Sequence, residues 1–282
     1  MRKILLIGGY GFLGSNVYNA LSNEYSVEVM SRFKHGGTNI QGKDWIEGDI
    51  TSKADMERVM GRGYDYVFDF VGLINEKEQK HYDVNVKGMQ NIIDAINATG
   101  TDPRVVYVSA INAENGTTAY FIAKYEAEKI LNRYSKHTII RPSILYGKYD
   151  FLTMQFYELL KRRIPVFPKS GLMYPVYVGD AVKVIKEEMH KDGAFNICSD
   201  EKLRFGDMFN MFGKKFGKKK IRQAPIKIFK MLAPILERAG AITSEQIKML
   251  EYDFYRDDSV LKNVVGNPMH YSEFVGSLEL RS

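Results

Sequence analysis

Tyr120 and Lys124 are the two residues of this sequence whose types and spacing best suit proton chemistry. They stand four residues apart in a stretch of helical periodicity, 120–135, so their side chains lie one turn apart on one face. A phenol with its ordinary pKa of about 10 is a poor acid or base at neutral pH, but a neighbouring ammonium favours the phenolate. We therefore predict Tyr120 as a general acid or base at a carbonyl-type carbon, with Lys124 lowering its pKa. Because a Tyr and a Lys at this spacing are also common on solvated helix surfaces, the surrounding elements must show whether this pair is functional.

A glycine-rich turn after the first apolar run, 3–7, predicts a dinucleotide site. The glycines follow the run directly and open the helical stretch 11–23. Glycine permits a sharp turn, close approach of the backbone to a pyrophosphate and tight packing of helix on strand, and a helix N-terminus offers N–H groups to an anion. The turn residues expected to contact the cofactor are Gly8, Gly11, Phe12, Leu13 and Gly14.

The residues at the end of the second apolar run, 26–31, predict which dinucleotide is preferred. A carboxylate there would bind the ribose 2′-hydroxyl of NAD(H), whereas a basic residue accommodates the 2′-phosphate of NADP(H). The sequence has Ser31 and Arg32 at this place, with Lys34 close behind and no carboxylate. We therefore expect NADP(H) to be preferred, with NAD(H) as the alternative if Arg32 is only a solvated loop residue.

The order of the apolar runs predicts the fold of the first 145 residues. Short β-rich runs alternate with longer stretches of helical period, which is typical of βαβ units around a parallel sheet covered on both faces. The expected strands are 3–7, 26–31, 44–47, 66–71, 105–109 and 138–141, and the expected helices are 11–23, 52–60, 78–99 and 120–135. Thr51 or Ser52 is the expected N-cap of the second helix, and Gly100 the C-cap of the third.

After Gly147 the rhythm of the sequence changes. The expected elements are a helix at 152–163, a loop at 165–175, a strand at 174–178, a helix at 180–190 and a strand at 195–198, before a helical, basic remainder. We predict an α/β fold of Rossmann type, a doubly wound parallel sheet with a smaller C-terminal α/β lobe. The NADP(H)-binding domain is predicted at 1–147 with 174–198 interleaved, and the substrate or docking lobe at 148–173 and 199–282.

Six motifs in this order resemble the extended short-chain dehydrogenase/reductase family, which is NAD-dependent epimerase/dehydratase-like, and they cover nearly the whole chain. They are the glycine turn, GDI at 48–50, VFDFVG at 67–72, NVKG at 85–88, Tyr120 with Lys124, and RPSILYG at 141–147. The resemblance implies that Lys124 holds the nicotinamide ribose. It also implies that Asp49 and Ile50 border the adenine, that Gly72 approaches the cofactor, and that Pro142 and Ser143 flank the nicotinamide.

One position departs from the pattern of active family members. They place Ser or Thr two residues beyond the strand-ending Ser109, where its hydroxyl helps Tyr to bind the substrate oxygen, but this sequence has Ile111. Losing one such donor typically costs roughly 10²- to 10³-fold in rate. Asn112, Thr117 or Thr118 is an alternative donor if the loop folds back. We assign Ser109 to the cofactor site, as a support of the strand end rather than as a reacting group, and leave catalysis open.

Within the family, the sequence is similar to the subgroup of the dehydrogenase-like accessory subunit of respiratory complex I and its prokaryotic relatives. The similarity lies in 174–180, in the helical stretch 225–240 and in 242–253. It implies an atypical NADP(H)-binding dehydrogenase-like protein that, if active, is a carbonyl or sugar-type oxidoreductase with a small-molecule substrate. The alternatives are a non-catalytic NADPH-bound scaffold on a membrane complex or partner protein, and a sugar-nucleotide epimerase or reductase, whose second lobe would have to bind a diphosphate.

Composition and charge narrow the classes of partner. The 282 residues are 45% hydrophobic and 26% charged, which excludes disordered, collagen-like and coiled-coil chains. The formal charge is +6, although 208–236 alone carries +8 and no acidic residue. A lysine cluster followed by a helix-like apolar stretch predicts docking on a membrane surface or a protein through 213–236, with a solvated lysine loop beside a packed helix as the alternative. Nucleic acid is disfavoured, because few aromatic residues there could stack on bases.

The single cysteine, Cys198, excludes an internal disulfide and a cysteine metal cluster, and no metal site is expected. No run of about 18 apolar residues could span a bilayer. We therefore expect a cytoplasmic protein, with peripheral attachment to the inner face of a membrane as the open alternative.

Overall fold

The chain divides into two compact units in the computed structural model, which describes residues 1–33, 40, 44–72, 80–161, 166–218, 220–238 and 242–279. The first unit comprises Met1–Arg141 and Val182–Phe195, and the second comprises Pro142–Ala181 and Asn196–Ser282. The segment that returns to the first unit lies within the range 174–198 indicated by the sequence.

Seven strands form the main sheet, in the order β11-β6-β5-β4-β1-β2-β3. They are β1 (Lys3–Ile7), β2 (Ser26–Ser31), β3 (Trp45–Glu47), β4 (Tyr66–Asp69), β5 (Arg104–Val108), β6 (His137–Pro142) and β11 (Gly193–Ile197). Ile4 of β1 lies opposite Val27 on one side and Tyr66 on the other, both in parallel pairs. The chain moves outward from β1 to β3 and then returns to β4 across β1, so the strand order reverses there. Open α/β sheets bind ligands at such a reversal, beyond the carboxyl ends of the strands. The predicted Rossmann-type fold is confirmed.

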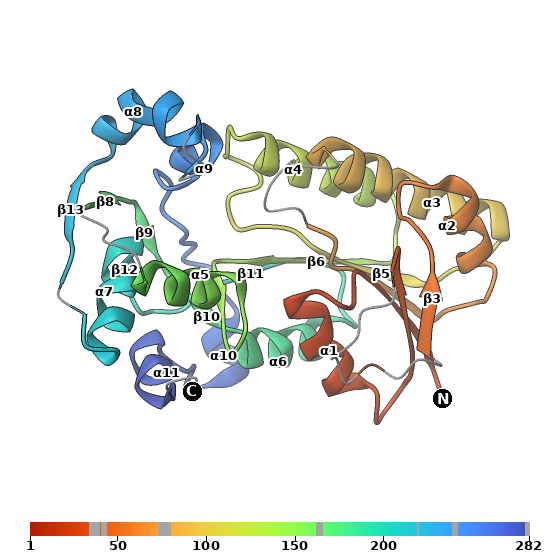
Figure 1. Ribbon diagram of the computed structural model, residues 1–282. Helices are drawn as coiled ribbons and strands as arrows, with labels where there is room; N and C mark the ends of the chain where they lie inside the picture. The colour runs from red at the N-terminus through yellow and green to blue at the C-terminus, as the bar shows by residue number, and fades with distance from the viewer. Residues whose placement is uncertain are drawn as a thin grey trace. The chain divides into compact units, whose positions relative to one another are not determined.

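Helices cover both faces of this sheet, as Figure 1 shows. On one face lie α2 (Lys53–Met60), α3 (Gly88–Thr99) and α4 (Ala119–Leu131), and on the other lie α1 (Phe12–Leu21) and α6 (Val178–Glu188). Ser52 caps α2 by accepting a hydrogen bond from the Asp55 amide. Gly100 ends α3 with a φ of 65°, which only glycine adopts without strain, so both predicted caps are confirmed.

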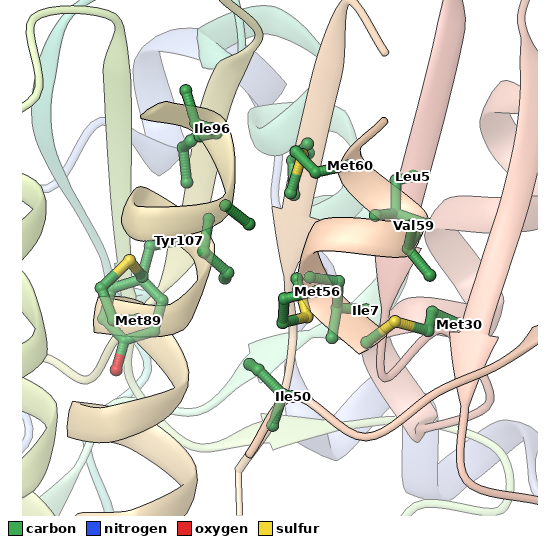
Figure 2. Packing of buried hydrophobic residues seen from close by; sticks show 14 of the residues in the cluster. Leu5, Ile7, Met30, Ile50, Met56, Val59, Met60, Met89, Ile96 and Tyr107 are labelled. Atoms are coloured by element: carbon green, nitrogen blue, oxygen red, sulfur yellow. The ribbon is translucent and has the colours of Figure 1, made fainter. Parts of the chain in front are cut away.

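A core cluster packs α2 and α3 onto the sheet. Figure 2 shows Met56 and Val59 of α2 beside Leu5 and Ile7 of β1. All four side chains are at most 1% exposed. Because β1 is covered by helices on both faces, its residues are continuously apolar rather than alternating.

The continuous helix predicted at 78–99 is wrong in its first part. A π-helical segment, η2 (Tyr82–Lys87), precedes α3, while residues 78 and 79 lie outside the described part of the chain. The side-chain NH₂ of Asn85 in η2 donates to the backbone carbonyl of His81, the residue before the segment, at 2.9 Å. Short π-helical segments are difficult to recognise in a sequence, because one added residue per turn scarcely changes the apolar pattern.

The second unit is built from three strand pairs and several helices among its described residues. The pairs are β7 (Leu145–Tyr146) with β10 (Val176–Tyr177), β9 (Leu172–Met173) with β12 (Leu203–Arg204), and β8 (Val166–Lys169) with β13 (Arg222–Pro225). The helices are α5 (Phe151–Leu160), α7 (Phe205–Lys215), α8 (Ile226–Arg238), α9 (Ser244–Met249), α10 (Leu261–Val265) and α11 (Tyr271–Ser277). The loop predicted at 165–175 is wrong, because β8 and β9 form there by pairing with strands far along the chain.

Among the described residues, no helix combines the length and apolar character needed to span a bilayer.

Candidate functional site

The glycine turn joins β1 to α1 with the geometry of an anion-binding loop. Gly8 has a φ of 76°, and its carbonyl accepts a hydrogen bond from the Gly11 amide at 2.9 Å. A Cβ on Gly14 would lie 2.7 Å from the Gly9 Cα, so only glycine permits this contact between turn and helix. Gly11 is the N-cap of α1 and no side chain caps this helix end. The first amides of α1 are therefore available to a phosphate.

Phe12 and Leu13 occupy the first turn of α1 in different environments. Leu13 is buried in the core, whereas Phe12 is half-buried and its carbonyl accepts hydrogen bonds from the side chains of Ser15 and Asn16. Leu13 thus anchors the helix, and the backbone of the turn carries the predicted cofactor contact.

Ser31 and Arg32 end β2, the strand beside the glycine turn. The Ser31 hydroxyl donates to the Phe33 carbonyl at 2.7 Å and accepts from the Trp45 indole at 2.9 Å. Arg32 is exposed, with its guanidinium 5.7 Å from the centre of the Phe33 ring. Lys34 lies outside the described residues. Of these two predicted cofactor residues, Ser31 is engaged in the strand end, and Arg32, the predicted 2′-phosphate ligand, is accessible.

Asp49 and Ile50 follow β3 in a loop that their own contacts hold in place. The Asp49 carboxylate accepts hydrogen bonds from the amide and the hydroxyl of Thr51, at 2.9 and 2.8 Å. The Asn91 side chain of α3 donates to the Ile50 carbonyl at 2.9 Å. Ile50 is buried, so its side chain supports the loop from within the core.

Tyr120 lies in the first turn of α4, which the Thr118 hydroxyl caps. Its ring is half-buried and meets the His81 imidazole edge-on, with 5.6 Å between the ring centroids. Burial raises the pKa of the Tyr120 phenol to about 12. The lowered pKa predicted from the sequence is wrong in direction, because desolvation dominates and the Lys124 ammonium is hydrogen-bonded elsewhere. Tyr120 therefore keeps its proton at neutral pH and is suited to donating it.

Lys124 is buried one turn further along α4, with 2% of its surface exposed. Its Nζ donates to the Val71 carbonyl at 3.0 Å and to the Val108 carbonyl at 2.9 Å, at the carboxyl ends of β4 and β5. Burial lowers the pKa of the ammonium to about 8, although the charges of Asp69 and Glu128 oppose this shift. An ammonium has three donors, so these two contacts leave one for a ligand.

Asp69, the last residue of β4, is a buried carboxyl group near Lys124. One of its oxygens accepts a hydrogen bond from the Val71 amide at 2.9 Å, and the other has no hydrogen-bond partner among the described residues. Burial raises the pKa of Asp69 to about 6, against the charge of Lys124. The two groups are therefore both ionised between about pH 6 and pH 8.

We expect the variant Asp69→Asn to lower the pKa of Lys124 further below about 8. The Asp69 charge is the larger of the two that raise this pKa, and the amide removes it without changing the side-chain volume much. An NMR titration of the lysine Cε signals measures the shift. Glu126→Gln is the control, because Glu126 is an exposed residue of α4 whose partner is Lys129. A Lys124 pKa that is equal in Asp69→Asn and wild type would contradict the assignment.

The loop between β5 and α4 contains position 111, where active family members have the hydroxyl of Ser or Thr. Ile111 is 1% exposed, so an apolar side chain fills the position. Of the alternative donors, Thr118 uses its hydroxyl to cap α4, Asn112 is buried and Thr117 is exposed. The Ser109 hydroxyl is buried and has no hydrogen-bond partner among the described residues, which leaves it able to bind a ligand.

Gly72, Pro142 and Ser143 complete the predicted cofactor residues. A Cβ on Gly72 would lie 3.8 Å from the Lys124 Nζ, so this backbone lies beside the lysine. Pro142 ends β6, and the next residue, Ser143, donates its amide to the Ile197 carbonyl at 2.7 Å. The Ser143 hydroxyl is buried without a described partner. The roles of Pro142 and Ser143 beside the nicotinamide stay predictions.

A buried ion pair supports Lys124 from the next turn of α4. Glu128 is fully buried and accepts two hydrogen bonds from the Arg141 guanidinium, at 2.9 and 2.5 Å. Arg141 also donates to Glu114 at 2.8 Å. This bidentate pair fixes α4 to β6, and it holds the turn that carries Lys124.

The first unit therefore fits a nicotinamide dinucleotide. The turn presents amides to a pyrophosphate, Arg32 is accessible beyond β2, Lys124 keeps one donor, and the Ser109 hydroxyl is a buried polar group without a described partner. No group of three His, Cys, Asp or Glu residues suited to a metal ion occurs in the described ranges.

The second unit contains a separate pocket of about 140 Å³. Arg256, Lys262, Asp200 and Ser199 are among its lining residues, together with the buried Cys198. One Nη atom of Arg256 and the Ser199 hydroxyl are buried and have no hydrogen-bond partner in the described part of the chain. Asp200 is neutralised by His270 and Lys262, at 2.9 and 3.7 Å. Asp257 also lines the pocket, so the Arg256 guanidinium and a carboxylate are both present there.

Three residues of the first site were not singled out from the sequence. Asp69 and Glu128 are charged residues at positions where the apolar pattern of their elements predicts burial, and that conflict was the available signal. The sequence around His81 did not mark it as a site residue, because only the fold of the η2 segment brings its ring to Tyr120.

The sequence of this chain is similar to those of known proteins. Residues 4–197 match the model of the NAD dependent epimerase/dehydratase family. A Methanocaldococcus jannaschii protein provisionally named UDP-glucose 4-epimerase is 24% identical over 76% of this chain and 82% of its own length. The UDP-glucose 4-epimerase of Vibrio cholerae is 26% identical over 58% of each chain.

Solved structures share the fold. The Bordetella bronchiseptica enzyme WbmH, in complex with NAD+, has a TM-score of 0.76 at 15% identity over 98% of this chain and 97% of its own. WbmG from the same organism, in complex with NAD and UDP, has a TM-score of 0.73 at 18% identity over 97% and 91%. Since the family model covers more than half of its residues, the chain belongs to the NAD dependent epimerase/dehydratase family.

Proposed function

We propose that this protein binds NAD(P) and transfers a hydride at a carbonyl or secondary-alcohol carbon of a sugar nucleotide. The observation that carries the proposal is the Tyr120 phenol, which keeps its proton one helical turn from the buried Lys124, at the carboxyl edge of the sheet where the glycine turn also lies. Membership of the epimerase/dehydratase family supports it. So do the names of the relatives, which are UDP-glucose 4-epimerases, and the NAD and UDP found with WbmG.

The chain's own residues would hold the cofactor at three places. The amides of the glycine turn bind the pyrophosphate, Arg32 contacts the adenine ribose, and the remaining donor of Lys124 binds the nicotinamide ribose. When bound, the nicotinamide supplies or accepts the hydride.

The protonation state of the Tyr120 phenol bears on the direction of hydride transfer at neutral pH. Reduction of a carbonyl forms a C–H bond by hydride addition and an O–H bond with the Tyr120 proton, while the C=O π bond breaks and the phenolate is left. Oxidation of an alcohol instead needs the phenolate at the start, and a pKa of about 12 disfavours that form. An epimerisation would use both steps in turn, so it needs each form of the phenol.

The cavity of the second unit provides what a diphosphate needs. Arg256 and Ser199 line a pocket of about 140 Å³, and one Nη atom of Arg256 and the Ser199 hydroxyl have no hydrogen-bond partner among the described residues. A diphosphate there would satisfy Arg256 and Ser199 with charge-assisted hydrogen bonds. Calorimetric titration with UDP tests this part: we expect binding by the wild type and a loss of at least about tenfold in Arg256→Gln, since a hydrogen bond to a charged group contributes about 1.5–3 kcal/mol.

Arg32 carries the proposed preference for NADP(H) over NAD(H). We expect Arg32→Ala to weaken NADPH binding by about 10- to 100-fold and to leave NADH binding unchanged, because only NADPH offers the 2′-phosphate. Fluorescence titration with the two reduced cofactors measures both affinities. Lys53→Ala, an exposed basic residue of α2, is the control for a general charge effect. Equal losses for both cofactors, or none, would refute the preference.

A second candidate function is a cofactor-bound scaffold without catalysis. The buried Ile111 favours it, since the position offers no hydroxyl to a substrate oxygen. The resemblance to the accessory subunit of respiratory complex I, which rests on 174–180, 225–240 and 242–253 alone, would fit the same role. The two candidates separate in one assay: NADPH that is consumed with UDP-linked keto sugars, or a UDP-sugar that is epimerised with the bound cofactor, supports the enzyme, whereas a cofactor that co-purifies and gives neither product supports the scaffold.

A further inference from the structure

Four large apolar side chains form an exposed stripe along α8. Ile228, Met231, Leu232 and Ile235 are 43, 74, 38 and 67% exposed. Their spacing of three, four and seven residues from the first puts them on one face of the helix. Such a continuous exposed apolar stripe is unusual on a soluble surface and indicates a contact with another apolar phase.

The stripe is not the face by which α8 packs on its own unit. Ala233 is buried, and Ile226, Phe229 and Leu236 are half-buried. By helical spacing these residues lie on a different side from the exposed stripe. The helix packs against α9, β8 and β13, so its place in the fold is already secured. The exposed stripe is therefore a second apolar face that the described fold does not use.

Positive charge borders the exposed stripe. Lys227 lies four residues before Met231 and Arg238 lies three after Ile235, so each neighbours the stripe on the helix surface. Neither forms an ion pair with a carboxylate among the described residues, whereas Lys230 pairs with Glu251 at 2.6 Å. The surrounding sequence 208–236 contains eight Lys and Arg and no acidic residue.

The wider basic segment divides into two parts in the structure. Lys214 and Lys215 lie at the end of α7, and β13 lies between them and α8 (Figure 1). We therefore restrict the docking segment predicted at 213–236 to α8, where apolar and basic residues are next to each other. Lys219 lies outside the described residues.

We propose that α8 docks this protein on an anionic phospholipid surface. The stripe enters the boundary between head groups and acyl chains, and Lys227 and Arg238 lie at the lipid phosphates. Apolar side chains on one face with Lys or Arg beside them are the composition of an interfacial helix, and each basic residue gains from the negative surface potential. A second copy of this chain is the poorer occupant, because it would bring two segments of charge +8 together.

Vesicle flotation of the full chain tests the proposal. With vesicles of phosphatidylglycerol and phosphatidylcholine in equal parts, at low salt, we expect the protein to float; with phosphatidylcholine alone we expect much weaker binding. The double variant Met231→Gln, Ile235→Gln loses at least about tenfold in partitioning, because it removes the two most exposed side chains of the stripe. The double variant Lys227→Gln, Arg238→Gln loses about fivefold for each charge.

Matched controls separate docking from general surface effects. Ile122→Gln with Phe151→Gln changes two exposed apolar residues outside α8, and Lys53→Gln with Lys129→Gln changes two exposed lysines outside it. Both controls float like the wild type. Tyr120→Phe also floats like the wild type, so docking is tested independently of hydride transfer.

Three results would overturn the proposal. The first is a wild type that stays with the soluble fraction on the anionic vesicles. The second is equal flotation of wild type and the Met231→Gln, Ile235→Gln variant. If sedimentation instead shows a dimer that this variant dissociates, the stripe is an interface between copies and the lipid assignment is wrong.

Discussion

Replacing Tyr120 with phenylalanine lowers the rate of hydride transfer by about 10²- to 10⁴-fold, which is the usual contribution of a positioned general acid. The phenol is the protonated group one helical turn from Lys124, and burial holds its pKa at about 12. Phenylalanine keeps the ring that contacts His81, so only the proton donor is removed. Single-turnover measurement of NADPH oxidation with a UDP-linked keto sugar gives the rate directly.

The control for this variant is the affinity for the cofactor. We expect Tyr120→Phe to bind NADPH as the wild type does, because the turn, Arg32 and Lys124 are unchanged. Weaker cofactor binding would assign Tyr120 to the cofactor rather than to the proton. An unchanged rate would mean that another group donates the proton.

Loss of the buried ion pair has the largest effect expected on stability. We expect Glu128→Gln to lower the free energy of unfolding by about 3–5 kcal/mol, because the Arg141 guanidinium, 11% exposed, loses its bidentate partner inside the protein. Urea denaturation followed by circular dichroism measures the change as a lower midpoint at an unchanged slope.

Glu126→Gln is the matched control for this change. Glu126 lies on the same helix and pairs with Lys129, but both side chains are more than 40% exposed. Exposed pairs contribute about 0–1 kcal/mol, so this variant stays close to the wild type. Equal destabilisation by the two substitutions would show that burial of the Glu128 pair is not what stabilises α4.

The elements with long apolar patterns could be predicted from the sequence, and those that depend on distant partners could not. β1 and β2 lie at their predicted bounds, and the caps of Ser52 and Gly100 are confirmed, because short-range signals determine them. β8 and β9 were predicted as a loop, since each is short and is stabilised by strands far along the chain.

The identities of Tyr120 and Lys124 as site residues could be predicted from the sequence, but their hydrogen bonds and pKa values could not. Spacing alone brought Tyr120 and Lys124 to one helix face, but it could not show that the Lys124 ammonium binds two backbone carbonyls. Burial of the Tyr120 phenol raises its pKa, against the lowering predicted from the sequence. Asp69 completes this environment, and its effect on Lys124 depends on burial that only the fold reveals.

Transfer of deuterium from reduced cofactor to sugar tests the central claim most directly. NADPH labelled with deuterium at the transferable position is mixed with UDP-linked keto sugars, and the masses of the products are measured by mass spectrometry. The proposed function predicts a product that carries one deuterium with the wild type and none, in the same time, with Tyr120→Phe at equal cofactor occupancy. If bound NADPH transfers no deuterium to any sugar nucleotide offered, the result contradicts hydride transfer and favours the non-catalytic scaffold.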